Sequence, residues 1–359
     1  MNTIVIIPTR DRPDILFRSI RNFGASNRIA NIKIESIVVS NDTSTKSGVL
    51  HVSEVVKMIG IEYPELKVHH LEPPILNRGR NYVMNNPGVA RNRAFSFIKQ
   101  NCIPHDSVLL LDDDISLTDC MYQFELHASD GQDLLCDIKK KAIADTRIIG
   151  CLYNGRQDLS LLENLSLICK MKCPKPELLA NCIRSGIPDS APGRISGAFL
   201  FINAPVYELP NFLPWYNEDY FWLRRMQLQG WKLECSARRL VHAPQDGLEI
   251  SKQKLMFEQY GETLWDASSI ISRNATFSEL SKILKNCIGR TINDLLALEK
   301  KAKILIHQNN TVKEMLRSIS STLFYFKKIQ KELNSYNFGN YAPPEMLQNL
   351  VQIAEYYDL

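Results

Sequence analysis

The chain has 359 residues, of which 45% are hydrophobic and 23% are charged. This composition supports a large buried core and excludes a disordered chain, in which apolar residues are scarce. The 43 Lys and Arg residues nearly balance the 39 Asp and Glu residues, which gives a net charge of +4. We therefore expect no nucleic-acid partner. At about 150 residues per domain, the length predicts roughly two domains.

Membrane-spanning and secreted classes are disfavoured as well. The first apolar run, residues 4–7, stops at Pro8 and is followed by charged residues, whereas a helix that crosses a bilayer needs about 20 apolar residues. The nine cysteines are odd in number and dispersed, which favours free thiols in a reducing compartment over a disulfide framework. We expect a cytoplasmic protein that is at most peripheral at the inner face of the membrane.

Short β-branched runs alternate with helical patterns in the N-terminal half, an order typical of a parallel sheet covered by helices. Strands are predicted at residues 3–8, 34–39, 66–71 and 107–111, and helices at residues 13–23, 49–59 and 88–100. Ligands bind outside the carboxyl ends of parallel strands. Polar residues that directly follow three of these strands should therefore meet at one edge: Thr9, Asp42, Asp112, Asp113 and Asp114.

The second half begins with predicted strands at residues 147–153 and 195–202, separated by a long proline-containing segment of the kind that forms lids or acceptor-binding loops. A helix over residues 218–229 ends at Gly230, and closing strands follow at residues 231–235 and 238–241. The pattern is helical from about residue 251 onward, in segments such as 277–287, 292–307, 311–334 and 344–356. We interpret this region as a helical cap or as a homodimerisation element.

An aspartate triplet, Asp112-Asp113-Asp114, directly follows the apolar strand at residues 107–111. Three adjacent carboxylates repel one another unless a cation lies among them, and hard oxygen ligands suit Mg²⁺ or Mn²⁺. The alternative is a solvated acidic turn, which fits poorly with a buried apolar strand that leads straight into it. The triplet therefore predicts a site for a metal ion and a phosphate group.

A second acidic pair, Glu218 and Asp219, lies among aromatic residues at the start of a predicted helix. Aromatic rings provide a partly dry environment, which raises the proton affinity of a carboxylate and makes it a better general base. Trp215 and Trp222 offer flat surfaces for a sugar, and Arg225 lies two helical turns from Glu218, where an ion pair is feasible. The alternative is an aromatic core patch beside an ordinary helix start, where acids are favoured by the helix dipole.

Four segments, in this order, resemble the GT-A glycosyltransferases of the large family 2. Residues 4–13 resemble that family's first strand and nucleotide-binding turn, and residues 88–94 are similar to its helix-opening motif with a central Arg-Asn. Residues 112–114 resemble its DxD motif, and residues 218–231 its Glu-Asp, arginine and glycine-aromatic sequence. The resemblance implies a Rossmann-like GT-A α/β domain, a mostly parallel sheet flanked by helices, over residues 1–245. A helical C-terminal domain would follow over residues 246–359.

The resemblance also implies a donor site for a nucleotide sugar. Thr9 and Asp42 would hold its base and ribose, and Arg91 would lie close to the nucleotide or its diphosphate. Arg10 stands where many relatives have an aromatic residue that stacks on the base, and a guanidinium can stack in its place. Asn41 remains an alternative to Asp42, because the usual acidic pair is missing here.

A metal site next to the donor is implied by the same resemblance. Asp112 and Asp113 would contact ribose and metal, and Asp114 would be the principal ligand of Mn²⁺ or Mg²⁺. His242 matches a position where some relatives supply a further ligand of the metal or the diphosphate, although a lone histidine after a strand is often structural.

The expected base is Asp219, which would deprotonate the acceptor hydroxyl and give inversion at the anomeric carbon, with Glu218 assisting or binding the acceptor. Residues 196–198 are small, which leaves room for a sugar ring or reflects simple strand packing. A divalent ion and a carboxylate would thus divide charge stabilisation and proton transfer between two clusters.

The sequence therefore predicts a metal-dependent, inverting glycosyltransferase that uses a nucleoside-diphosphate sugar, expected to be a UDP-sugar. The acceptor class stays open among glycan, lipid-linked and peptide acceptors. A sugar nucleotidyltransferase is the enzymatic alternative, although residues 9–14 lack the glycine and lysine of its usual phosphate loop. A nucleotide- or carbohydrate-binding module without turnover is the other alternative, and the presence of both acidic clusters disfavours it.

Overall fold

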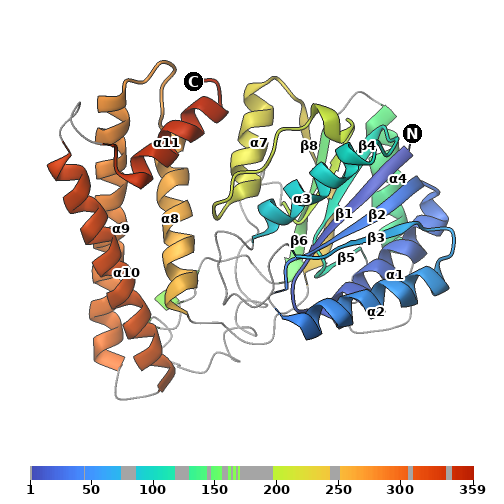
Figure 1. Cartoon of the computed structure of the whole chain (residues 1–359), viewed down its shortest axis with the longest axis horizontal. Coiled ribbons are helices and arrows are strands. Elements are labelled where there is room, and N and C mark those ends of the chain that lie inside the picture. Colours follow the sequence, from blue (N-terminus) through green and yellow to red (C-terminus); the bar gives the residue numbers. More distant parts are fainter. Residues whose placement is uncertain are drawn as a thin grey trace. The chain divides into compact units, whose positions relative to one another are not determined.

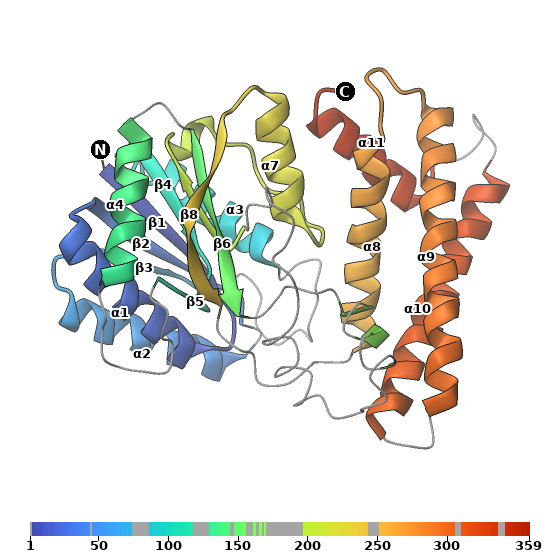
Figure 2. The ribbon, with the colours of Figure 1, turned by 180° about the vertical axis from the view of Figure 1, so that it is seen from behind.

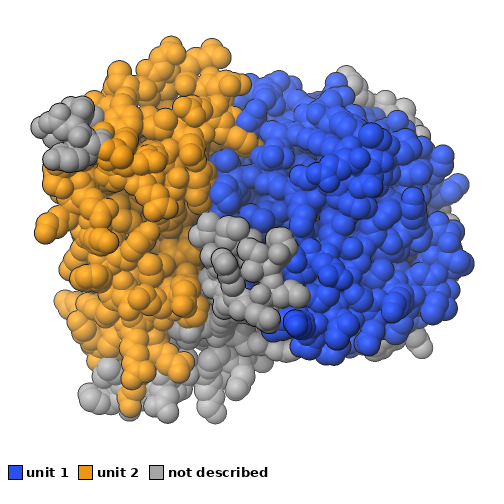
Figure 3. Space-filling model, in the orientation of Figure 1, with its two compact units in different colours: residues 1–157, 186–214, 218–244 blue, residues 158–185, 215–217, 245–359 orange. Residues whose placement is uncertain are grey.

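The computed structural model of the chain (Figure 1) describes residues 2–43, 45–73, 86–117, 129–143, 147–155, 161–162, 165–166, 169, 197–242, 251–305, 310–336 and 342–359. The chain forms two compact units, which Figure 3 shows in different colours. The first unit comprises residues 1–157, 186–214 and 218–244, and the second comprises residues 158–185, 215–217 and 245–359. Each unit is described by itself below.

The described strands of the first unit form one mixed sheet (Figures 1 and 2). They are β1 (Asn2–Thr9), β2 (Lys33–Asn41), β3 (Val68–Leu71), β4 (Ser107–Leu111), β5 (Ile115–Ser116), β6 (Ile148–Gly155), β7 (Phe199–Ile202) and β8 (Leu233–His242). Their order is β3-β2-β1-β4-β7-β6-β8-β5. The pairs within β3-β2-β1-β4 and the β6–β8 pair are parallel, and the others are antiparallel. The predicted mostly parallel α/β sheet is confirmed.

Helices cover both faces of this sheet. They are α1 (Pro13–Ala30), α2 (Lys46–Glu62), α3 (Pro87–Gln100), α4 (Ser129–Ile143) and α7 (Glu218–Leu228), with a short 3₁₀ helix at Val206–Glu208. Two of the helices begin with proline in the first turn, where the missing N–H costs no hydrogen bond. In α3, the N-cap residue Asn86 accepts a hydrogen bond from the backbone N–H of Val89 at 2.9 Å.

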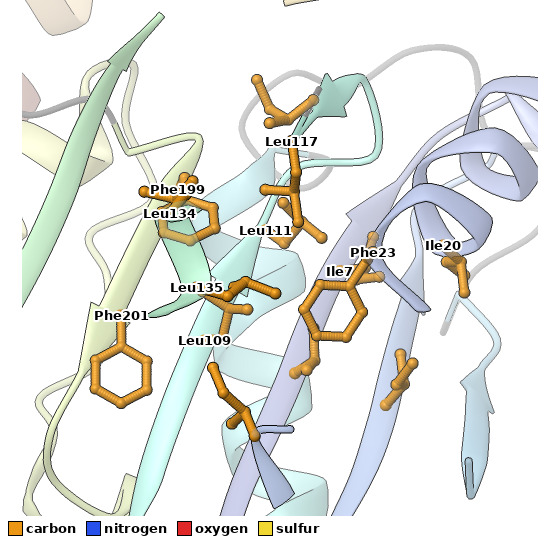
Figure 4. Close-up of a cluster of buried hydrophobic side chains, with 14 of the residues drawn as sticks. Ile7, Ile20, Phe23, Leu109, Leu111, Leu117, Leu134, Leu135, Phe199 and Phe201 are labelled. Carbon is orange, nitrogen blue, oxygen red and sulfur yellow. The ribbon is translucent and has the colours of Figure 1, made fainter. Parts of the chain in front are cut away.

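The alternation of side chains along the strands creates two cores. Val5 and Ile7 of β1, together with Leu109 and Leu111 of β4, belong to a cluster with α1, α2 and α4. Figure 4 shows Ile7 and Leu109 in this cluster with Phe23 of α1. The intervening residues of the same strands face the other cluster, which contains side chains of α3 and α7. Both faces of β1 and β4 are therefore buried, which accounts for their continuous apolar sequences.

The larger differences from the sequence prediction concern one helix, one strand and one pair of helices. Helix α4 was not predicted, although Leu134, Leu135, Ile138 and Ala142 are buried at helical spacing. The two strands predicted between residues 231 and 241 form the single strand β8, because a register shift against β6 between Gly150 and Leu152 accommodates the break. The helices predicted at residues 277–287 and 292–307 likewise form one continuous helix, Phe277–Leu305.

The second unit is helical in its described part, as predicted. Its helices are α8 (Lys252–Ser269), α9 (Phe277–Leu305), α10 (Asn310–Ser335) and α11 (Glu345–Tyr356). Polar contacts join them: the hydroxyls of Thr263 and Thr291 lie 2.8 Å apart, Asn349 donates to the Tyr260 hydroxyl at 2.7 Å, and the Ser320 hydroxyl donates to Glu299 Oε1 at 2.8 Å. None of the helices searched in the described residues combines the length and apolarity needed to cross a bilayer.

Truncation of Ile7 tests the inner core of the sheet. Ile7 is fully buried, so Ile7→Ala should lower the free energy of unfolding by about 2–5 kcal/mol through lost burial and the resulting cavity. Ile61 of α2 is 82% exposed, and Ile61→Ala is the matched control with an expected effect within about 0.5 kcal/mol. Urea denaturation followed by circular dichroism measures both. Equal effects would contradict the described core.

Candidate active site

The carboxyl ends of β1, β2 and β4 lie at one edge of the sheet and bring distant polar residues together. The backbone N–H of Asp42 donates to the carbonyl oxygen of Thr9 at 2.8 Å. The Thr9 hydroxyl in turn donates to Oδ2 of Asp113 at 2.7 Å, across 104 residues of sequence. The structure therefore places Thr9, Asp42 and the aspartate triplet in one neighbourhood, with the Thr9 hydroxyl engaged in positioning Asp113.

Arg12 holds two members of the triplet. Its Nη2 donates to Asp113 Oδ1 and its Nη1 donates to Asp114 Oδ2, each at 2.6 Å. Arg12 is the N-cap residue of α1 and makes no side-chain cap hydrogen bond there. Its guanidinium is instead the positive charge shared by two adjacent carboxylates.

Burial makes this charge pairing important. Burial raises the pKa of Asp113 to about 7, although Arg12 acts in the opposite direction. Burial also opposes the charge on Arg12, but the carboxylates of Asp113 and Asp114 outweigh that effect and raise the pKa of Arg12. The guanidinium is therefore fully charged, and ionised Asp113 depends on a cation beside it.

Arg91, in α3, joins the triplet to the second acidic cluster. Its Nη2 donates to Asp112 Oδ1 at 2.8 Å and to the carbonyl oxygen of Gly197 at 3.1 Å. Its Nη1 donates to Glu218 Oε1 at 3.1 Å, and the guanidinium lies 5.3 Å from the centroid of the Phe212 ring. The side chain is only 2% exposed. The arginine expected near the diphosphate thus serves as a buried link between two carboxylates.

Asp219 is held by backbone groups. Its Oδ2 accepts a hydrogen bond from the N–H of Gly197 at 3.0 Å, and its Oδ1 accepts one from the N–H of Tyr220 at 2.9 Å. A Cβ atom at Gly197 would overlap the Asp219 carboxylate. Among the small residues 196–198, Gly197 therefore makes room for this carboxylate, a role that the sequence did not reveal.

Glu218 is chemically distinct from its neighbour. Burial, together with the charge of Asp219, raises the pKa of Glu218 to about 8, and Arg91 only partly offsets this effect. Glu218 is therefore mostly protonated near neutral pH, and in the protonated form its carboxyl group can donate a hydrogen bond. The ion partner that the structure shows for Glu218 is Arg91, whereas the sequence suggested Arg225.

The end of β2 forms a third polar group. Asp42 is paired with Arg93 of α3 at 3.1 Å, and burial raises the pKa of Asp42 to about 6 despite that pair. Asn41 is fully buried; its amide nitrogen lies 3.3 Å from Nε2 of His70, and its Oδ1 accepts from the N–H of Thr43. Arg10 contributes to the electrostatics of Asp42 and lies 20% exposed. Of the two candidates, Asp42 is the one that carries charge at this edge.

Trp215 and Trp222 were both expected to offer a flat ring surface to a sugar, and the structure buries both side chains. Trp222 is fully buried, donates from Nε1 to the Pro210 carbonyl at 3.0 Å and stacks on Phe212 at 5.2 Å between ring centroids. It is therefore a core residue, and its assignment to substrate is wrong because no ring surface is left for a ligand. Trp215 is also largely buried, and it belongs to the second unit rather than to the first.

Other predicted site residues lie outside the described side chains. The backbone of His242 ends β8 and pairs with Ile115, and its side chain is not among those described. The expected acceptor-binding segment between residues 152 and 192 is also largely outside the described residues. The principal residues missed by sequence reasoning are Arg12 and Arg93, and the signal for them was their place inside the matched segments 4–13 and 88–94.

The triplet fits a divalent cation by its chemistry. Asp113 and Asp114 already direct carboxylate oxygens at one positive group, the Arg12 guanidinium. Mg²⁺ commonly uses one or two carboxylates and completes its coordination with water and substrate phosphates. Within the described part of the chain, no three His, Cys, Asp or Glu side chains gather as ligands of one metal ion.

Comparison with known proteins gives matches to solved structures alone. Neither a protein-family model nor a curated protein matches the chain. Staphylococcus aureus TarS, residues 1–349 in complex with UDP-GlcNAc, is 13% identical over 95% of this chain and 94% of that chain, with a TM-score of 0.46. The galactosyltransferase LgtC, in complex with donor and acceptor sugar analogues, is 13% identical over 57% of this chain and 59% of that chain, with a TM-score of 0.28.

Mouse xyloside xylosyltransferase 1, in its apo form, is also similar. It is 10% identical over 65% of this chain and 78% of that chain, with a TM-score of 0.28. At these scores the likenesses assign neither a substrate nor an activity to this chain.

A double-mutant cycle tests the Arg91 link. Arg91→Met should lower the free energy of unfolding by about 3 kcal/mol, because it leaves partly buried Asp112 without its cation and buried Glu218 without its hydrogen-bond donor. Glu218→Gln keeps an acceptor for Arg91 and should cost about 1 kcal/mol or less. The double variant should cost at least about 0.5 kcal/mol less than the two single costs added together. Strictly additive costs in urea denaturation would contradict direct coupling of Arg91 and Glu218.

Proposed function

We propose that the chain is an inverting glycosyltransferase that moves a sugar from a nucleoside-diphosphate sugar to an acceptor hydroxyl. The observation that carries the proposal is the Arg91 bridge, in which one buried guanidinium contacts both Asp112 at the end of β4 and Glu218 at the start of α7. The aspartate triplet, which we propose as the cation site, and the second carboxylate pair are thereby linked, an arrangement that suits transfer from a diphosphate leaving group to a hydroxyl.

The donor would lie at the carboxyl ends of β1, β2 and β4. Asp42, buried and paired with Arg93, is suited to accept hydrogen bonds from a base or a ribose. Asp112 has a side chain that is 24% exposed and is the member of the triplet most available to ribose hydroxyls. A UDP-sugar is the donor that we expect.

Asp219 is the proposed general base. Each of its oxygens accepts a backbone N–H, an arrangement that suits the ionised form and fixes the orientation of the carboxylate. Glu218, whose pKa is raised by burial, would be protonated and would orient the acceptor by donating a hydrogen bond. Attack by the deprotonated hydroxyl on the face opposite the leaving diphosphate breaks the anomeric C–O bond once and inverts the configuration.

Asp113 and Asp114 are the residues that would hold Mn²⁺ or Mg²⁺. When bound, such an ion would neutralise charge on the leaving diphosphate. The acceptor itself is proposed only as a hydroxyl of a glycan, a lipid-linked intermediate or a peptide.

Incubation with a panel of α-linked UDP-, GDP- and dTDP-sugars tests the proposal without a known acceptor. Water can replace the acceptor slowly, so proton NMR should show release of the β-anomer of the sugar before mutarotation. Initial release of the α-anomer would contradict inversion. Donor-dependent thermal shifts without any turnover would favour a binding module, and the absence of both responses would count against a transferase.

Asp219→Asn tests the base. Transfer or donor hydrolysis should fall at least about a hundredfold while donor affinity is retained, because proton removal is lost while the amide, which gives up one of the two backbone hydrogen bonds, has nearly the same size. Asp106, which accepts a hydrogen bond from the N–H of Asn2, supplies the matched control Asp106→Asn with unchanged turnover. If Glu218→Gln loses turnover and Asp219→Asn does not, the base is Glu218.

Gly197→Ala tests whether the position of the Asp219 carboxylate matters for turnover. The added methyl group would displace the Asp219 carboxylate, so turnover should fall at least about tenfold with little change in donor affinity. At Gly60 of α2 an added Cβ would meet no atom within 4 Å, which makes Gly60→Ala the control. Full turnover in Gly197→Ala would show that the observed position of Asp219 is not the working one.

A further inference from the structure

Arg12 and Arg91 are bound to the acidic residues in different ways. Arg91 is 2% exposed and makes hydrogen bonds to two carboxylates and a backbone carbonyl. Arg12 has a side chain that is 30% exposed, whereas Asp113 and Asp114, to which it binds, are 1% and 5% exposed. Arg12 is thus the solvent-facing member of its cluster, and its side chain is the one that can leave.

We propose that Arg12 is an internal cation that occupies the carboxylates of Asp113 and Asp114 in the free protein and transfers to the diphosphate of the donor when a divalent ion takes its place. This inference rests on the metal-dependent transfer proposed above and adds a role for a residue that no motif assigned. It concerns binding alone, since no covalent bond of the protein changes.

Competition follows from the geometry. The same two carboxylate oxygens, Asp113 Oδ1 and Asp114 Oδ2, receive the Arg12 guanidinium at 2.6 Å. A guanidinium and a divalent cation cannot share these atoms closely, because like charges at contact distance repel strongly. Arg12 must therefore move before these two oxygens can coordinate a metal ion.

A destination for the displaced guanidinium is available once the donor binds. A diphosphate carries negative oxygens whose spacing suits the planar, two-pronged donor group of arginine. The charge on Arg12 persists in either position, because a guanidinium stays protonated at any physiological pH. Exchange of partners therefore keeps each charge in the site compensated.

The backbone around Arg12 confines the exchange to the side chain. Asp11 has a positive φ of 50° and is bound by the Thr43 hydroxyl, while Pro13 fixes the first position of α1. The carbonyl oxygen of Arg12 accepts the N–H of Leu16 at 3.0 Å. With its main chain anchored, Arg12 can redirect its guanidinium without unfolding the turn.

Binding of Mn²⁺ alone to the full chain tests the first half of the proposal. The free ion is counted by electron paramagnetic resonance, with no nucleotide present. Arg12→Ala should bind Mn²⁺ at least about tenfold more tightly than the unmodified protein, because the competing cation is gone. Arg12→Lys retains a cation and should stay within about threefold of the unmodified protein. Unchanged or weaker binding in Arg12→Ala would overturn the proposal.

Binding of UDP at saturating Mn²⁺, measured by calorimetry, tests the second half. Arg12→Ala should weaken UDP at least about tenfold, the opposite direction to its effect on Mn²⁺ alone. The matched control is Arg21→Ala, which should leave both affinities unchanged. Arg21 lies in α1, the helix that Arg12 caps, and pairs with Glu62 of α2 at 2.7 Å. A purely structural role for Arg12 would weaken both ligands together and would contradict the exchange.

These outcomes are separable from the proposed reaction. Opposite shifts in Mn²⁺ and UDP affinity without turnover on any donor would uphold the exchange and contradict the transferase. Inverting turnover with equal Mn²⁺ affinities in the unmodified protein and Arg12→Ala would uphold the transferase and contradict the exchange. Circular dichroism establishes that each variant is folded, and the uncharged variant Arg12→Gln replaces Arg12→Ala in both measurements if Arg12→Ala does not fold.

Discussion

The compensation of negative charge at one edge of the sheet constrains the whole first unit. Five carboxyl groups, those of Asp112, Asp113, Asp114, Glu218 and Asp219, are held near two guanidinium groups, those of Arg12 and Arg91. Buried carboxylates are costly without a cation. Helices α1 and α3 therefore position Arg12 and Arg91 beside the carboxylates and also pack against the sheet in its two cores.

Arg12 and Arg91 compensate the carboxylate charge at different degrees of burial. Arg91 lies inside, against Phe212 and the Gly197 carbonyl, where a fixed guanidinium sets the distance between the end of β4 and the start of α7. Arg12 lies nearer to solvent, where a cation can be exchanged. Burial thus separates a structural charge from a replaceable one, although both residues carry the same chemical group.

Much of the fold could be predicted from the sequence, because β1 and β4 are apolar on both faces and end abruptly in polar residues. The same reasoning located the aspartate triplet and the pair Glu218–Asp219. It could not choose the partner of Glu218, since Arg225 lies on the same helix whereas Arg91 approaches from α3, 127 residues away. It also assigned Trp222 to a ligand, because aromatic spacing alone does not separate a sugar platform from a core residue stacked on Phe212.

The balance of charge indicates what the site requires in addition. In the part of the chain that the structure describes, Arg12 and Arg91 are the guanidinium groups that pair with members of this acidic cluster, and burial raises the pKa of Asp113 and of Glu218. A diphosphate would add negative charge to this edge and could bind well only if positive charge arrived with it. A divalent ion at Asp113 and Asp114, as proposed above, would supply two charges and release that of Arg12, so an arriving anion would meet more positive charge than the ion alone brings. The acidic cluster, which would repel a free diphosphate, would thereby favour one that arrives with its metal.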